Sequence, residues 1–159
     1  MAQIDISALQ ELDERFQQVY EALPQERAAL HRRIGEAVQG ELGERIASSL
    51  DDSSGKVRSW QRVHLGSKGG YAAIRPAGTK DSPPGKSGPD GPGAITTYLE
   101  RGHRIRPPKG GKGYRPRIRV GRAAGRGFYQ GTQDAARAIA LREAQAWGDE
   151  IARKLEGKV

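Results

Sequence analysis

The sequence predicts an α+β fold with helices at both ends of the chain and short antiparallel strands between them. Apolar residues recur at helical spacing near both ends, apolar and polar residues alternate in the middle, and much of the glycine and proline lies in the central stretches. At 159 residues the chain is most simply a single domain. The expected arrangement is a small antiparallel sheet of hairpins packed against N-terminal helices and a long C-terminal helix, with extended loops rich in glycine and arginine.

The first predicted elements are two helices over residues 7–50. Apolar side chains form one stripe as far as Leu23, and Pro24 then breaks or bends the chain and suits the first turn of a second helix. In that second helix, apolar residues recur every four positions as far as Leu50. Three of its glycines are expected to let another backbone approach closely: Gly35, Gly40 and Gly43.

A β-hairpin is predicted over residues 57–75. Side chains alternate from Val57 to Leu65, glycine-rich turn residues follow, and a second strand resumes at Tyr71. The stretch 76–93 is dense in proline, glycine and serine, and we expect it to be a flexible, exposed loop.

A short helix, a basic arm and a long helix are predicted in the second half of the chain. Residues 94–101 form one or two helical turns, for which Gly102 serves as the C-cap. The basic arm covers residues 101–127 and is expected to be a second hairpin with a glycine-rich tip. The C-terminal helix covers residues 132–156, and Trp147 on its apolar line is expected to be largely buried.

Positive charge is concentrated in the basic arm. Every charged residue from Arg101 to Arg126 is basic, which places ten cations in 26 residues. The formal net charge of the whole chain is +8, so the rest of the chain carries −2. Seven arginines of the arm are candidate contacts to a neighbouring subunit or to DNA: Arg101, Arg104, Arg106, Arg115, Arg117, Arg119 and Arg122.

The basic arm has two interpretations. Arginine pairs bidentately with phosphate, and the aromatic residues Tyr114, Phe128 and Tyr129 lie in or beside the arm, which favours contact with nucleic acid. Residues 117–120 alternate as an amphipathic strand would, and arginine equally suits protein interfaces. Docking of the arm onto a protein partner is therefore at least as well supported as docking onto nucleic acid.

Residue types that carry catalysis or bind metals are scarce. The chain has no cysteine, which excludes disulfides and thiol nucleophiles. His31 and His64 are expected to be exposed, and His103 to face the end of a helix, without the spacing of metal ligands. We therefore predict no enzyme, no cofactor and no metal site. A toxin- or nuclease-like enzyme with a basic groove is a distant third interpretation, for which no ionisable pair can be named.

The first residues do not resemble a targeting signal. They lack the basic and apolar regions of a signal peptide, and no apolar run approaches the ~20 residues needed to span a bilayer. We expect no membrane partner, and a protein that acts in a cytoplasm or in a particle assembled there.

A resemblance to a known family rests on the stretch from Leu99 to His103. The order of helix, hairpin, loop, this stretch, basic arm and terminal helix resembles the gene-ten-like neck or tail-completion (head–tail joining) proteins of lambda-like siphophages. Those proteins show a Leu-Glu-x-Gly-His stretch, which Leu99, Glu100, Gly102 and His103 match. A glycine- and arginine-rich segment and an amphipathic terminal helix follow in them, as here.

The resemblance implies a non-enzymatic virion protein with an α+β fold and a curved antiparallel sheet. Such proteins form rings at the head–tail junction or at the tail end, as neck, tail-completion or tail-terminator proteins, and a hexameric ring is favoured over a dodecameric one. The implied partners are copies of the same chain and the other neck, connector and tail-tube proteins, with non-specific contact to packaged DNA. The implied location is the virion, assembled in the host cytoplasm. The alternative is a nucleic-acid-binding module that uses residues 101–126.

Overall fold

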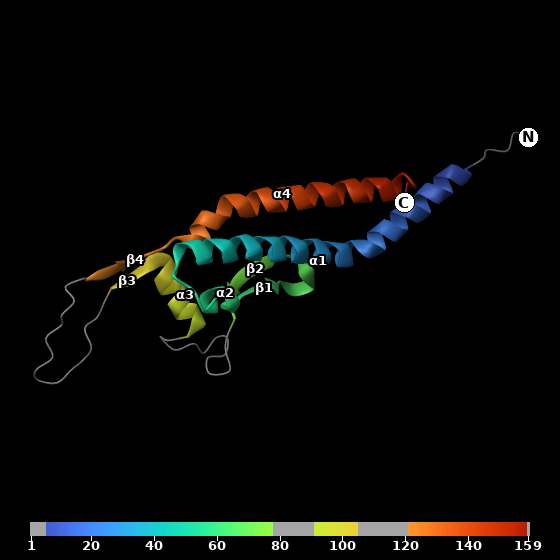
Figure 1. Ribbon diagram of the computed structural model, residues 1–159. Helices are drawn as coiled ribbons and strands as arrows, with labels where there is room; N and C mark the ends of the chain where they lie inside the picture. Colours follow the sequence, from blue (N-terminus) through green and yellow to red (C-terminus); the bar gives the residue numbers. More distant parts are fainter. Residues whose placement is uncertain (1–5, 78–90, 105–120, 159) are drawn as a thin grey trace, which may run out of the picture. The chain divides into compact units, whose positions relative to one another are not determined.

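The computed structural model describes residues 6–77, 91–104 and 121–158, and it has the expected α+β fold (Figure 1). Two small antiparallel sheets of two strands each lie between two long helices in chain order. The elements are α1 (Ser7–Ser49), α2 (Lys56–Trp60), β1 (Gln61–Leu65), a 3-10 turn (Ser67–Gly69), β2 (Ala72–Pro76), α3 (Pro92–Arg101), β3 (Gly102–Arg104), β4 (Arg122–Ala124) and α4 (Phe128–Leu155).

The chain divides into two compact units. The first comprises Met1–Gln39, Val63–Ile74 and Asp134–Val159, and the second comprises Gly40–Arg62 and Arg75–Gln133. Helices α1 and α4 and the hairpin β1–β2 contribute residues to both units. Within the described ranges, no helix has the length and apolar character needed to cross a bilayer.

Helix α1 is continuous over 43 residues, so the prediction of two helices separated at Pro24 is wrong. Proline lacks the N–H that would bond the carbonyl four residues earlier, yet its fixed φ near −65° is compatible with a helix. Residues with high helix propensity flank Pro24 on both sides and offset a local cost of about 3 kcal/mol. Figure 1 shows a bend in the blue part of α1, as expected for an internal proline.

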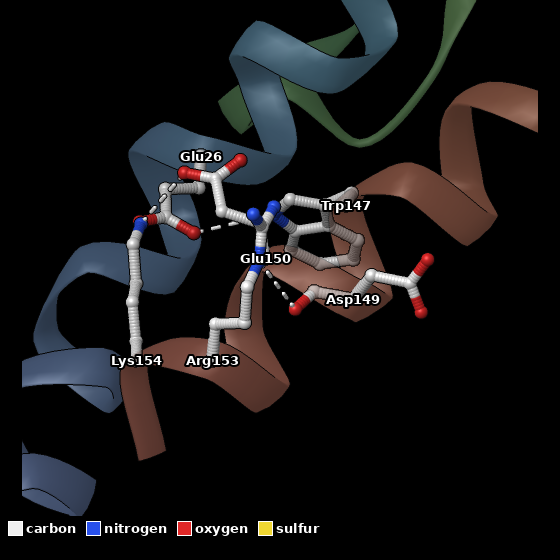
Figure 2. A network of polar contacts seen from close by, with 6 residues as sticks. All are labelled: Glu26, Trp147, Asp149, Glu150, Arg153 and Lys154. Carbon is white, nitrogen blue, oxygen red and sulfur yellow. Dashed lines mark hydrogen bonds and ion pairs between the residues drawn. The ribbon is translucent and has the colours of Figure 1, made fainter. Parts of the chain in front are cut away.

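In the first unit, α4 contacts α1 through a polar network centred on Glu26 (Figure 2). The Glu26 carboxylate accepts hydrogen bonds from the Trp147 indole Nε1–H at 3.2 Å and from Lys154 Nζ at 2.6 Å. The bond from Lys154 lowers the pKa of Glu26, and the same bond raises the pKa of Lys154. Trp147 is half-buried, and its indole N–H finds a hydrogen-bond partner in this carboxylate.

The turn of the first hairpin lies close to α1 in the same unit. Gly35 faces Val63, and Gly69 faces Ala28, at distances that leave no room for a Cβ atom without movement of the neighbour. The atoms nearest Gly35 belong to the side chains of Val63 and Ala72, so the packing there is close but is not the expected approach of a second backbone. His31 is half-buried, not exposed as predicted, and its Nδ1–H donates to the Gly69 carbonyl at 2.6 Å.

The first hairpin is shorter than predicted, because residues 57–60 belong to α2 instead of a strand. The Asp52 carboxylate accepts hydrogen bonds from the backbone N–H groups of Lys56 at 2.9 Å, Val57 at 3.0 Å and Arg58 at 3.2 Å. These bonds satisfy donors that the start of a helix leaves free. Residues 57–60 therefore form a helix that Asp52 caps, although their alternating side chains predict a strand.

Two further expectations about exposure and close packing are corrected. His64 is half-buried instead of exposed, and its Nε2 has no hydrogen-bond partner among the described residues. Gly43 faces the aliphatic part of the Arg58 side chain and Gly40 faces open space, so no second backbone among the described residues approaches either of them.

The second unit has a small core in which polar and apolar side chains are both buried. Helix α4 begins at Phe128, four residues before the predicted start at residue 132. Thr132 lies within the helix, is 5% exposed and donates a hydrogen bond to the Phe128 carbonyl at 2.7 Å. The most buried side chains of this unit are Leu42, Ile46, Gln61, Thr96, Phe128 and Thr132.

The end of α3 and the base of the second hairpin agree with prediction, whereas the first connection is shorter than the predicted loop 76–93, because Pro76 belongs to β2 and α3 begins at Pro92 instead of residue 94. Helix α3 ends at Arg101, and Gly102 follows it with a φ of 75°, as expected for the predicted C-cap. Strands β3 and β4 pair antiparallel, so a second hairpin is confirmed at its base. The predicted loop 76–93 falls largely on residues 78–90, and the predicted tip of the arm falls on residues 105–120; both ranges lie outside the described residues.

Candidate interaction site at the base of the basic arm

The site is built at the junction where α3, the two short strands and the start of α4 meet in the second unit. The Glu100 carboxylate accepts hydrogen bonds from the backbone N–H of Tyr129 at 2.9 Å and of Gln130 at 3.1 Å. These donors belong to the first turn of α4, which has no acidic residue of its own. A negative charge at this position satisfies free donors and interacts favourably with the helix dipole. Glu100 therefore caps α4 from 29 residues away in the sequence.

Backbone contacts complete the junction. The Leu99 carbonyl accepts a hydrogen bond from Arg126 N–H at 2.8 Å, and the Glu100 carbonyl accepts one from Gly127 N–H at 3.1 Å. Gly102 lies against the backbone of the opposite strand, where a Cβ atom would collide with the Ala123 carbonyl oxygen. Its positive φ and this close approach both require glycine at position 102.

The two aromatic residues at the start of α4 belong to the packing of the junction. Phe128 is 2% exposed, and its ring contacts the Tyr129 ring at a centroid distance of 5.2 Å. The Tyr129 hydroxyl donates a hydrogen bond to Gln61 Oε1, and Gln61 itself is buried. Burial, and secondarily the charge of Glu100, raise the pKa of Tyr129 to about 12. The predicted role of this aromatic pair in contacting nucleic acid is therefore wrong for Phe128, which is not accessible.

Arginines surround this junction and remain exposed. In the β3–β4 register Arg104 lies directly opposite Arg122, so two like charges face each other across the strands. Such a pair is destabilising unless an anionic group lies between or beside the charges. Arg101 and Arg126 are also exposed, and none of the four forms an ion pair with another described residue.

An open depression adjoins these arginines. Arg101, Arg126, Tyr129, Gln130 and Gln133 line it together with Glu100. The guanidinium groups offer several N–H donors, so the depression suits a carboxylate or another anionic group. In the described part of the chain, no three His, Asp or Glu side chains cluster in a way that would hold a metal ion.

The motif residues predicted from the sequence are brought together here, in different roles. Leu99, Glu100 and Gly102 hold the junction through backbone and capping contacts. His103 is exposed on β3, and its ring lies 5.3 Å from that of Tyr98 between centroids. Of the candidate contact arginines, Arg101, Arg104 and Arg122 stand at the base of the arm. The others lie outside the described residues: Arg106, Arg115, Arg117 and Arg119.

The contribution of Gln61 and Tyr129 to this site is not predictable from the sequence pattern. Their hydrogen bond joins residues 68 positions apart, and neither residue belongs to a recognisable motif. The only indication in the sequence was the polar residue Gln61 on the apolar side of the predicted strand, a position that requires a partner when buried.

Comparison of the chain with protein-family models, with curated proteins and with solved structures finds no match. The resemblance carried by Leu99, Glu100, Gly102 and His103 therefore remains a proposal about the family.

Proposed function

We propose that this chain is a non-enzymatic structural protein of a tailed-phage virion, which forms a ring at the head–tail junction or the tail end and joins head to tail. One observation carries the proposal: the facing arginines Arg104 and Arg122 lack an anionic partner among the described residues. They stand on a junction fixed by Glu100, and Glu100 belongs to the stretch that resembles the phage family. A cationic surface whose facing arginines have no counter-charge among the described residues is suited to contact with an anionic surface of another molecule.

A protein partner fits this surface better than a phosphate backbone. Phe128 is buried, and the Tyr129 hydroxyl is bound to Gln61. Neither ring is therefore free to stack on a nucleic-acid base beside the exposed arginines. A surface that meets a different surface on the next copy generates a closed ring when the rotation closes. A hexamer that contacts neck, connector and tail-tube proteins is the assembly proposed.

The test is the mass of the purified protein, measured by light scattering at low and moderate salt, with and without duplex DNA. A ring-sized species without DNA is the expected result. Reversal of the facing arginines, Arg104→Glu with Arg122→Glu, should abolish the ring while circular dichroism stays unchanged. Reversal of Arg32 and Arg137 makes the same change of charge at exposed positions without a described ion pair, and it should leave the ring intact.

Nucleic-acid binding is the second candidate function, since the same unpaired arginines also suit phosphate. It predicts a monomer that forms a complex with duplex DNA, with an affinity that falls log-linearly with salt. A protein that is monomeric without DNA and forms a salt-sensitive complex with duplex DNA would overturn the structural proposal.

A further inference from the structure

The N-terminal part of α1 carries an apolar stripe that the rest of its unit leaves uncovered. Leu9 is 65% exposed and Tyr20 is 73% exposed, and Ile6 and Phe16 are each 51% exposed. Leu9, Phe16 and Tyr20 are separated by seven and four residues, so they lie on one face of the helix. Exposed apolar side chains that form a contiguous patch mark an interaction site more often than a bare surface.

This stripe extends past the place where α4 ends. The Arg15 guanidinium donates to the Leu155 carbonyl at 3.4 Å, at the last residue of α4, and also pairs with Glu11 at 3.2 Å. The turns of α1 before Arg15 therefore lie beyond the C-terminal end of α4, and Figure 1 shows this end of α1 projecting past the end of α4. Arg15 is engaged at that end and is not available to the stripe.

Acidic side chains accompany the stripe. Asp13 lies four residues after Leu9 and three before Phe16, which places it on the same face, and Glu14 lines the same open groove as these two residues. Residues 6–23 contain four carboxylates and one cation, for a net charge of −3. The carboxylates are Glu11, Asp13, Glu14 and Glu21, and the last three form no ion pair with another described residue.

The negative charge of residues 6–23 limits which kind of partner can bind the stripe. A second copy of the same stretch would bring −3 against −3, which opposes pairing of the stripe with itself. Amphipathic helices that bind membranes carry Lys and Arg on the polar face, whereas this one carries acids. The complementary partner is cationic, and the chain itself holds one: residues 101–126 carry +10, with exposed Arg104 and Arg122 at the base.

We propose that the exposed face of α1 from Ile6 to Tyr20 binds the basic arm of a second copy of this chain. The contact is head-to-tail, because α1 of one copy meets the arm of the next and leaves its own arm for a third. The inference rests on the proposed function in one respect: it assigns one contact within the assembly proposed above.

The absence of cysteine from the chain makes a clean cross-linking test available. One protein carries Leu9→Cys and a second carries Arg122→Cys; the two are mixed and treated with a short bis-maleimide. The expected product is a covalent pair that contains one chain of each kind. The control mixture pairs Arg122→Cys with Glu36→Cys, an exposed α1 position away from the stripe, and should give at least about ten-fold less product.

Charge reversal on the stripe provides a second, independent measurement. Asp13→Lys with Glu14→Lys should weaken self-association at least about ten-fold by light scattering, with unchanged circular dichroism. The matched control reverses Glu36 and Asp149, which are exposed and have no ion pair with a described residue, and should associate as the wild type does.

The outcomes separate this inference from the proposed function. Rings that form normally with the stripe reversed, or a dominant cross-link between two Leu9→Cys chains, would overturn the inference and leave the ring function standing. A wild-type protein that stays monomeric in all conditions would overturn both.

Discussion

Glu100 caps α4 through the backbone N–H of Tyr129, at 2.9 Å, although the two residues are 29 positions apart. Glu100 is the next-to-last residue of α3, and β3 begins two residues later. The contact therefore holds the base of the basic arm against the start of the C-terminal helix within the second unit. A carboxylate at a helix start contributes both hydrogen bonds and favourable interaction with the helix dipole.

Removal of this carboxylate should destabilise the junction. We expect Glu100→Ala to lower the free energy of unfolding by about 1–2 kcal/mol, because two donors at the start of α4 lose their acceptor. Urea unfolding measures the loss, and amide exchange should accelerate at Tyr129 and Gln130. Glu36→Ala, at an exposed position without a described ion pair, is the control and should change stability by less than about 0.5 kcal/mol. Equal effects of the two substitutions would contradict the capping role.

Gly102 should tolerate no side chain. Gly102→Ala is expected to cost more than about 1 kcal/mol, because φ is 75° and the added Cβ would collide with the opposite strand. Gly121→Ala is a matched control, since a Cβ there meets nothing within 4 Å. Thermal unfolding of the two variants checks the difference, and a neutral Gly102→Ala would show that β3 and β4 separate readily.

The Tyr129 phenol makes stability depend on alkaline pH. Its pKa is raised from 10.0 to about 12, so between these values the unfolded state loses a proton that the folded state keeps. Stability therefore falls as pH rises through this window, by about 1 kcal/mol once the exposed part of the ring is allowed for. Tyr129→Phe should remove this part of the pH dependence. A tyrosinate absorbance titration in which all tyrosines ionise near pH 10 would rule out the burial effect.

The hydrogen bond from Lys154 lowers the pKa of Glu26. Folding stability should therefore fall as the pH is lowered, whereas the Tyr129 effect lowers stability as the pH is raised. The unfolded state takes up a proton near pH 4.5 while the folded state resists it, so the stability contributed above that pH is lost as pH falls through the lowered pKa. Glu26→Gln should be less stable than the wild type at neutral pH and should flatten the acid limb. Glu14→Gln, which alters an acid without a described ion pair, is the control. Superimposable acid limbs for wild type and Glu26→Gln would contradict the assignment.

Trp147 should contribute less than a fully buried tryptophan does. Because its ring is half-buried, Trp147→Ala is expected to cost about 1–3 kcal/mol, below the ~3–5 kcal/mol of a packed core site. Trp147→Phe keeps most of the apolar contact and loses only the bond to Glu26, so it should cost less. Urea denaturation separates the two, and a loss above about 4 kcal/mol for Trp147→Ala would mean that the indole is more deeply packed than its exposure indicates.

The sequence by itself determined the fold class, the presence of helices at both ends of the chain, the hairpin at its centre and the location of the positive charge. These features depend on local periodicity and on glycine and proline, whose backbone preferences act within a few residues. The predicted helix end at Gly102 holds for this reason, since its positive φ is a local property.

Only the tertiary structure decided where α2 and α4 begin and which side chains serve the site. Asp52 and Glu100 cap helices from outside them, and Gln61 reaches Tyr129 over 68 residues. Such outcomes depend on contacts between residues that are distant in the sequence, and a local sequence pattern does not specify those contacts.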